Sequence, residues 1–273
     1  MSTPTEGTAP APPPRPPVSG GPGTPIDVPG VRNLRDAGGV GELRPGILYR
    51  SGALDALTAR GAERLGELGL RTVIDLRSTP EVAAAPDVRD GLGFTYRRAP
   101  VFVERRWPAE QRELYPAMAG RAGRSTVAVI RAITAPGAVP VLVHCASGKD
   151  RTGLTVAVLQ TLLGASEAEV TEDFLRSNEA LGLGTWAHSA VGGPVAGEQP
   201  LAVNGLVAGE RPGGGSPRPG HGALPVAATH LFHALLWIRS HHGSVPDWLL
   251  AHGATESELA DLRAVLSGRP RTP

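Results

Sequence analysis

A chain of 273 residues is long enough for one sizeable α/β domain whose core offsets the conformational entropy lost on folding. Its 27 Lys and Arg residues nearly balance its 26 Asp and Glu residues, so the net charge does not indicate a nucleic acid or an anionic membrane as partner. The single cysteine, Cys145, excludes an internal disulfide and any zinc or iron–sulfur site built from several cysteines of one chain.

Two stretches of biased composition set the expected domain boundaries. Residues 1–25 are rich in Pro, Gly, Thr and Ala and have almost no large apolar side chain, which predicts a disordered, Pro-rich tail. A Gly- and Pro-rich insertion at about 182–222 has few apolar anchors, which favours a flexible spacer slightly over a lid. We therefore expect a single domain over residues 26–268 that contains this insertion, followed by a short tail at 269–273.

No segment has the pattern of an export signal or a transmembrane helix. The first residues lack a basic region followed by an apolar one, and no later run approaches the ~20 apolar residues that span a bilayer. The single cysteine also favours a reducing compartment. The sequence therefore predicts a cytoplasmic protein, with secretion by a route without a cleavable signal left open.

Strand and helix signals alternate through the first half of the chain. The apolar run Ile47–Tyr49 predicts a strand, and Thr58 caps a helical pattern that ends near Gly69. Two further runs rich in β-branched residues predict buried strands at 71–76 and 139–143. The second of these strands leads directly into a loop.

The second half of the chain predicts helices. Residues 153–163 are apolar nearly all round, as in a helix packed in the centre of a domain. Ser166 with Glu169, and Thr255 with Glu258, have the spacing of capping boxes, so each pair predicts the start of a further helix. The alternation predicts an α/β fold with a mostly parallel central sheet flanked by helices and with active-site loops at the carboxyl ends of the strands.

The segment HCASGKDRTG at 144–153 joins the predicted central strand to the buried helix. A loop of this kind aims successive backbone N–H groups into one concavity, and the helix N-terminus adds partial positive charge, so the loop suits a tetrahedral dianion. Gly148 permits the tight curl. The same field favours thiolate over thiol at Cys145, which makes this residue a candidate nucleophile toward phosphorus.

Two side chains at the end of the loop complete this chemistry. Five residues separate Cys145 from Arg151, whose planar guanidinium can donate two hydrogen bonds to phosphoryl oxygens as charge spreads over them in the transition state. Thr152 follows, and its hydroxyl is placed to hydrogen-bond the cysteine sulfur and help it leave in a second step. The loop therefore predicts a phosphate-binding site with Cys145 as nucleophile and Arg151 as clamp.

This C-x5-R segment resembles the signature of the protein tyrosine phosphatase superfamily, and more closely that of the atypical bacterial tyrosine phosphatases of the kind secreted by mycobacteria. Segments 31–39, 43–51, 73–78, 173–178 and 243–245 also resemble that family. The resemblance implies a phosphatase-like fold, a cysteinyl-phosphate intermediate and phosphotyrosine proteins as substrates. Phosphoserine, phosphothreonine or phosphoinositides are further expected substrates, and neither a cofactor nor a metal is expected.

The expected site extends to the neighbours of Cys145 and Arg151. His144 is expected to support the loop and the thiolate rather than carry a proton. Lys149 is expected to add positive charge above the phosphate, which would suit more highly charged substrates. The residues expected to bind the substrate are Ala146, Ser147, Gly148, Lys149, Thr152 and Gly153.

The reaction also needs an acid that protonates the leaving oxygen and a base that activates water. Most tyrosine phosphatases carry an aspartate for this purpose on a separate loop, but residues 100–107 offer only Glu104. Asp150 is the first choice, because in the resembling family an aspartate at this position is proposed for that role. The alternative role of Asp150 is structural, in which its carboxylate binds a neighbouring backbone N–H or arginine.

Other polar residues have structural interpretations beside functional ones. Asn33, Arg35 and Asp36 are expected to brace the first strand rather than approach the substrate. Asp75 and Arg77 are expected to form an ion pair beside the site. Four histidines near the C-terminus are expected on the surface and at the end of a helix rather than around a metal ion. They are His230, His233, His241 and His242.

Two other functions compete with a phosphatase. A rhodanese-like sulfurtransferase also mounts one cysteine on a loop between strand and helix, but Arg151 and the Lys149–Asp150 pair argue against it. A binding module that captures phosphorylated partners without turnover is disfavoured by the intact Cys145 and Arg151, although the absent outer-loop acid supports it.

Overall fold

The computed structural model describes residues 23–103, 108, 111–184 and 223–269. Most of the expected tails and most of the expected insertion at 182–222 lie outside these residues, as does Glu104. Within the described ranges, no helix is both long and apolar enough to cross a membrane.

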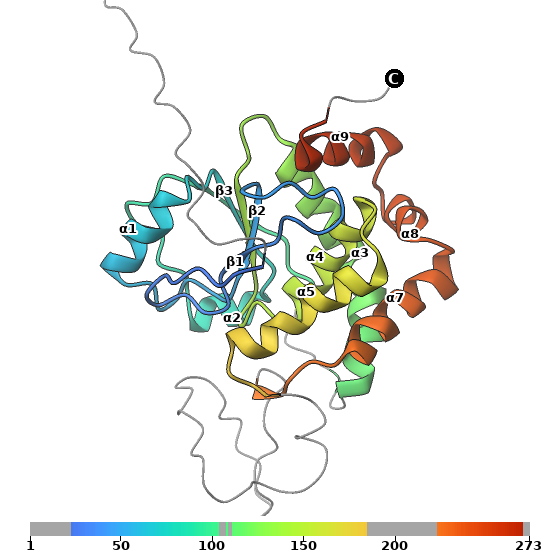
Figure 1. Ribbon diagram of the computed structural model, residues 1–273, viewed down its shortest axis with the longest axis horizontal. Helices are drawn as coiled ribbons and strands as arrows, with labels where there is room; N and C mark the ends of the chain where they lie inside the picture. The colour runs from blue at the N-terminus through green and yellow to red at the C-terminus, as the bar shows by residue number, and fades with distance from the viewer. Residues whose placement is uncertain (1–22, 104–107, 109–110, 185–222, 270–273) are drawn as a thin grey trace, which may run out of the picture.

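A five-stranded sheet lies at the centre of the fold (Figure 1). The first strand runs antiparallel to its neighbour, and the other neighbouring strands are parallel. These pairings confirm the expected mostly parallel sheet. From one edge to the other, the strands are β1 (Arg35–Asp36), β2 (Leu48–Ser51), β5 (Val141–His144), β3 (Thr72–Asp75) and β4 (Thr95–Arg98).

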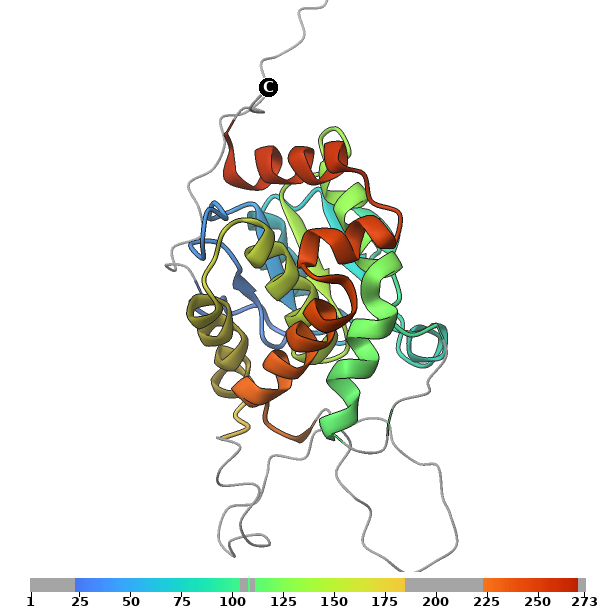
Figure 2. The same ribbon diagram turned by 90° about the vertical axis from the view of Figure 1, so that its right-hand side faces the viewer.

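Helices flank this sheet on both faces (Figures 1 and 2). Among the described residues they are α1 (Ala59–Glu67), α2 (Thr79–Ala84), α3 (Gln111–Thr134), α4 (Asp150–Leu162), α5 (Glu167–Ala180), α7 (Ala228–His242), α8 (Val245–Ala251) and α9 (Glu256–Ser267). Successive strand residues point to opposite faces. Leu142 therefore joins the apolar cluster that includes α1, whereas Val141 and Val143 join the larger cluster that includes α3, α4 and α7.

Helix α4 is enclosed between the sheet and the other helices. Twelve of its thirteen residues are buried, as its apolar sequence predicts. It begins at Asp150, three residues before the predicted start, because the preceding loop turns directly into the helix and Gly153 N donates to the Lys149 carbonyl oxygen (2.9 Å). The N-terminus of a buried helix therefore faces the loop that carries Cys145.

The local signals in the sequence hold in the structure. At the starts of α1, α5 and α9, the side chains of Thr58, Ser166 and Thr255 accept a hydrogen bond from the backbone N–H three residues later, as predicted. The predicted strands at 71–76 and 139–143 are confirmed as β3 and β5. These elements depend on short-range patterns, which explains why the sequence predicts them well.

Helix α3 is not predicted by the sequence pattern, because glycines and Pro116 lower its intrinsic helix propensity. A Cβ at Gly120 would lie 3.3 Å from the ring of Trp237 in α7, and a Cβ at Gly123 would lie 2.2 Å from the ring of His252. The two glycines let α7 and the end of α8 approach α3 closely. Tertiary packing therefore overrides propensity here.

Candidate active site

The predicted phosphate-binding loop lies between the central strand β5 and the buried helix α4. Cys145 follows β5 directly and is 1% exposed, and α4 begins at Asp150. Gly148 has a φ of +70°, and a Cβ at this position would lie 2.3 Å from backbone atoms of Ser51. The structure confirms that glycine is needed for the curl of this loop.

The loop is held through its carbonyl groups, by donors both from the loop segment itself and from other parts of the chain. Each carbonyl oxygen from Cys145 to Lys149 lies at hydrogen-bond distance from a donor. In order along the chain, these donors are His144 Nδ1 (3.3 Å), Ala53 N (3.1 Å), Asn33 Nδ2 (3.1 Å), Arg50 Nη2 (3.0 Å) and Gly153 N (2.9 Å). The C=O and N–H of a trans peptide unit point in opposite directions, so carbonyl groups fixed outward turn the N–H groups toward the concave side, where they can bind an anion.

A buried charged cluster fixes two of these donors. Arg50 pairs with Asp173 (Nη1–Oδ2, 2.8 Å), and Arg35 reaches the other oxygen of Asp173 (3.5 Å) while its Nη1 donates to Asn33 Oδ1. Burial followed by the charge of Arg50 lowers the pKa of Arg35 to about 9. Burial raises the pKa of Asp173, but Arg50 and Arg35 together outweigh it and lower that pKa.

The contacts of the N-terminal motif are those of bracing, as the sequence predicts. Asn33 donates to the loop and is itself held by Arg35, and Asp36 accepts hydrogen bonds from Gly38 N (2.8 Å) and Gly46 N (2.6 Å). The three side chains are buried. None of these hydrogen bonds requires a substrate.

Arg151 is oriented by a residue that sequence reasoning missed. Its terminal nitrogens donate to both carboxylate oxygens of Glu81 (2.7 and 2.8 Å). Glu81 also accepts from the backbone and side chain of Ser78 in a capping box at the start of α2. Burial raises the pKa of Glu81, but Arg151 and Ser78 outweigh it and lower that pKa to about 2. The S-x-x-E spacing at 78–81 is a sequence signal for a helix start at Ser78, but it does not indicate that Glu81 pairs with Arg151.

His144, the last residue of β5 before the loop, lies in a buried polar network with Asp75 and Asp87. Its Nε2 is 3.3 Å from Asp87 Oδ2, and its Nδ1 is 4.0 Å from Asp75 Oδ1. Arg77 pairs with Asp75 (3.0 Å) and Asp87 (2.7 Å), and the Tyr96 hydroxyl donates to both carboxylates. The expected Asp75–Arg77 ion pair is confirmed, and these contacts are consistent with the supporting position expected for His144.

The same network has side chains that could bind a metal ion, but their negative charge is already balanced by an arginine. Asp75, Asp87 and His144 lie close enough together to hold a metal ion. However, the guanidinium of Arg77 already pairs with both carboxylates, so the position of a cation is taken. A metal ion would have to displace a buried arginine, and the donor set therefore does not fit a resident metal.

Lys149 and Asp150 are both enclosed. The Lys149 side chain is fully buried; its Nζ donates to the Leu224 carbonyl oxygen and lies 3.7 Å from Asp150 Oδ2. Asp150 Oδ1 accepts a hydrogen bond of 2.6 Å from the hydroxyl of Tyr115 in α3. Sequence reasoning missed Tyr115, which has no local signal because it lies 35 residues before its partner.

One expectation about the end of the loop needs correction. The hydroxyl of Thr152 is buried but makes no hydrogen bond with any described residue, so the expected bond to the Cys145 sulfur is absent. A Cβ at Gly153 would lie 2.8 Å from the Phe174 ring and 3.3 Å from Arg50 Nη2. The lack of a side chain at Gly153 therefore admits α5 and Arg50 against α4, and the expected binding of substrate by this residue stays a prediction.

The four C-terminal histidines all lie on α7. His233 and His241 are exposed and His242 is half-buried, which fits the predicted helix surface and end. His230 does not, because it is buried and its ring stacks on that of Tyr115 with centroids 5.0 Å apart. The expected surface position of His230 is therefore wrong, and this residue lies in the interior against Tyr115.

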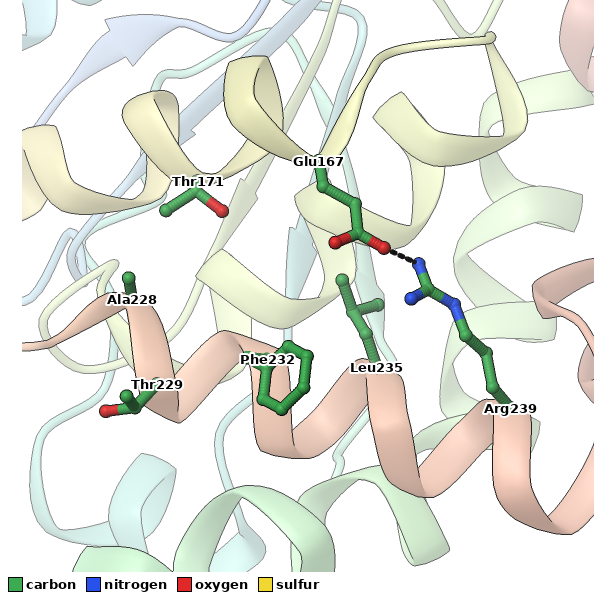
Figure 3. A pocket seen from close by; sticks show the side chains of 7 residues that line it. All are labelled: Glu167, Thr171, Ala228, Thr229, Phe232, Leu235 and Arg239. Carbon is green, nitrogen blue, oxygen red and sulfur yellow. Dashed lines mark ion pairs between the residues drawn. The ribbon is translucent and has the colours of Figure 1, made fainter.

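A hollow of about 280 Å³ between α5 and α7 is separate from this loop (Figure 3). An ion pair between Glu167 and Arg239 closes one side of it. It is lined by Glu167, Thr171, Ala228, Thr229, Phe232, Leu235 and Arg239. The lining contains no residue of the loop that carries Cys145, so this hollow is not the candidate active site.

The chain is similar in sequence to several known proteins. A protein of Cupriavidus necator that is named "putative tyrosine-protein phosphatase" is 31% identical over 170 residues, which cover 55% of this chain and 61% of that protein. The triple specificity protein phosphatase PtpB of Mycobacterium tuberculosis is 29% identical over 57% of this chain and 70% of its own length. A tyrosine-protein phosphatase of Nostoc commune is 29% identical over 80% of this chain and 73% of its own length. A model of the tyrosine phosphatase family matches residues 26–268, and this chain therefore belongs to that family.

Proposed function

We propose that this chain hydrolyses phosphate monoesters, above all phosphotyrosine in proteins, through a cysteinyl-phosphate intermediate on Cys145. The observation that carries the proposal is the set of hydrogen-bonded carbonyl groups from Cys145 to Lys149. It supports a ring of N–H groups around the nucleophile at the N-terminus of α4, where a phosphoryl dianion is stabilised. Membership of the tyrosine phosphatase family supports the same reaction.

In the first step, the Cys145 thiolate attacks phosphorus; the S–P bond forms and the P–O bond to the leaving alcohol or phenol breaks. Negative charge on the equatorial oxygens is stabilised by the loop N–H groups and by Arg151. The bidentate pair with Glu81 supports this role, because it fixes the plane of the guanidinium before substrate binds. In the second step, water attacks phosphorus and the S–P bond breaks.

Asp150 is the proposed carrier of the proton in both steps. As an acid it protonates the leaving oxygen, and as a base it takes a proton from the attacking water. Its position in the first turn of α4, five residues after Cys145, supports this assignment. The competing structural role is a hydrogen bond to Tyr115 and proximity to Lys149, and the activity of Asp150→Asn separates the two.

Substrates beyond phosphotyrosine are part of the proposal. The name of the mycobacterial relative, a triple specificity protein phosphatase, supports phosphoserine and phosphothreonine as additional substrates. Phosphoinositides are proposed because Lys149 places a cation in the loop itself. The buried contact of Lys149 with the Leu224 carbonyl oxygen means that this lysine would act mainly through its charge.

The proposed compartment is the cytoplasm. A catalytic thiol must stay reduced, and Cys145 is the only cysteine of the chain. Reducing compartments preserve such thiols. Fractionation of the source cells with an antibody to the chain would test this, and recovery of the active protein only outside the cells would overturn it.

Phosphate release tests the proposed function directly. A phosphotyrosine peptide and a phosphoinositide are each incubated with the wild type, Cys145→Ser, Asp150→Asn and a control, His233→Gln, which changes an exposed residue of α7. We expect turnover by the wild type and the control, none by Cys145→Ser, and a loss of at least about 100-fold in Asp150→Asn. Phosphopeptide binding without phosphate release by the wild type would identify a binding module instead.

A further inference from the structure

Tyr115 is held rigidly beside the proposed proton carrier. Its side chain is fully buried in α3, and its hydroxyl donates a 2.6 Å hydrogen bond to Asp150 Oδ1. The ring of His230, from α7, stacks on one face at 15° with centroids 5.0 Å apart. The ring of Phe174, from α5, makes an edge contact at 6.0 Å. Two helices other than its own therefore fix the direction in which the phenol points.

The electrostatic surroundings keep this hydroxyl a donor. Burial, followed by the charge of Asp150, raises the pKa of Tyr115 well above its ordinary value, and the charge of Cys145 acts in the same direction. Burial lowers the pKa of His230 to about 4, so its ring is neutral near pH 7 and adds no charge beside Asp150. Tyr115 therefore donates to the carboxyl group throughout the pH range in which the enzyme would work.

The hydrogen bond makes the two oxygens of Asp150 different from each other. Oδ1 is occupied by the Tyr115 hydroxyl, whereas Oδ2 lies 3.7 Å from Lys149 Nζ. A protonated Oδ1 would be a weaker acceptor for the Tyr115 hydroxyl than an unprotonated one, so this hydrogen bond favours a proton on Oδ2 over one on Oδ1. The transferable proton of Asp150 is therefore directed to Oδ2.

We propose that Tyr115 is a positioning residue for the proton transfer, one that orients Asp150 so that Oδ2 gives and takes the proton. The inference rests on the proposed function and deepens it. In the first step the S–P bond forms, the P–O bond breaks, and the proton moves from Oδ2 to the leaving oxygen. In the second step water attacks phosphorus, the S–P bond breaks, and the proton of the water returns to Oδ2, which restores the acid and the thiolate.

The test uses two aryl phosphates that differ in their need for an acid. The leaving phenolate of 4-nitrophenyl phosphate is stable without protonation, whereas that of phenyl phosphate is much more basic. We expect Tyr115→Phe, which keeps the ring contacts, to lower kcat about tenfold for phenyl phosphate and less than about twofold for 4-nitrophenyl phosphate. Asp150→Asn should show the same selectivity with a larger loss. A purely structural role of Tyr115 would lower both rates together.

Tyr49→Phe is the matched control. Tyr49 is also a buried tyrosine, but it lies in β2 and belongs to the apolar cluster on the α1 side of the sheet. Its variant should keep the leaving-group dependence of the wild type. Thermal unfolding of both variants shows whether either has lost its fold.

The outcomes separate this inference from the proposed function. No turnover of either substrate by the wild type overturns the function itself. Turnover with the expected selective loss in Asp150→Asn but a wild-type pattern in Tyr115→Phe overturns only the role of Tyr115. An unchanged leaving-group dependence in both variants overturns the acid role of Asp150 and the positioning role together.

Discussion

At the scale of single residues, the site consists of a few groups whose partners come from distant parts of the chain. Cys145, Gly148 and Arg151 are predictable from the sequence because their chemistry resides in one short loop. Glu81 lies 70 residues before Arg151, and Tyr115 lies 35 residues before Asp150, so no local pattern marks them as partners. Only the folded arrangement brings these residues to the loop.

The Asp87–His144 contact predicts a pH dependence of stability. Burial raises the pKa of Asp87, but His144 and Arg77 outweigh it and lower the pKa from 3.8 to about 2. A depressed pKa in the folded state contributes stability above the unfolded value, and this contribution is lost as the pH falls from about 4 toward 2. The size of the shift corresponds to roughly 2 kcal/mol.

Urea unfolding of the wild type and Asp87→Asn at several pH values measures this contribution. Asp87→Asn should be clearly less stable at pH 7, and the difference in free energy of unfolding should shrink by roughly 2 kcal/mol as the pH approaches 2. Asp90→Asn, an exposed position, is the control and should show no such trend. A difference that stays constant with pH would contradict the role given to Asp87.

At the scale of elements, the loop depends on contacts from segments before and after it. The N-terminal segment supplies Asn33 and Arg50, and α5 supplies Asp173, which pairs with Arg50 in the buried cluster. Charges buried in this way are stable only while their partners remain, because an unpaired buried charge costs several kcal/mol. The shape of the loop between β5 and α4 therefore depends on Asn33, Arg50 and Asp173.

Gly148→Ala tests whether the shape of the loop is essential. Gly148 and Gly137 both have a φ of +70°, but a Cβ would meet the Ser51 backbone at 2.3 Å in the first case and nothing within 4 Å in the second. Gly137→Ala therefore isolates the cost of a left-handed backbone, which is about 1–2 kcal/mol. Gly148→Ala adds a collision on top of this cost.

We expect Gly137→Ala to keep wild-type affinity for inorganic phosphate, and Gly148→Ala to lose at least about tenfold in affinity because its N–H groups no longer converge. Isothermal titration of both variants, with urea unfolding as a check on folding, measures the two effects. Equal phosphate affinity in Gly148→Ala and the wild type would show that the curl of the loop is not what binds the anion.

The elements also show how far sequence patterns reach. Helix-capping residues and β-branched runs predict α1, α5, α9, β3 and β5, because these signals lie within a few residues of one another. Helix α3 was missed because Gly120 and Gly123 disfavour a helix locally, yet they allow Trp237 and His252 to pack against it. Its prediction required knowledge of which helices lie beside it, and so did the prediction of Tyr115.

At the scale of the whole molecule, the fold gathers the site from nearly the full length of the matched region. The family match over 26–268 begins before Asn33, the first brace of the loop, and extends past α7, which stacks His230 on Tyr115. The central position of β5 in the sheet places the loop at the carboxyl end of a strand that is parallel to both of its neighbours. In such sheets this end is where ligands bind.

The most direct test of the central claim is to trap the intermediate. The wild type is mixed with a phosphotyrosine peptide and quenched within milliseconds. The protein is then digested under conditions that preserve the S–P bond of phosphocysteine, and the peptide that contains Cys145 is examined by mass spectrometry. We predict one added phosphoryl group on Cys145, formed before phosphate release and absent from Cys145→Ser. Release of phosphate without any such adduct on Cys145 would contradict the assignment of the nucleophile, and with it the catalytic role of the loop.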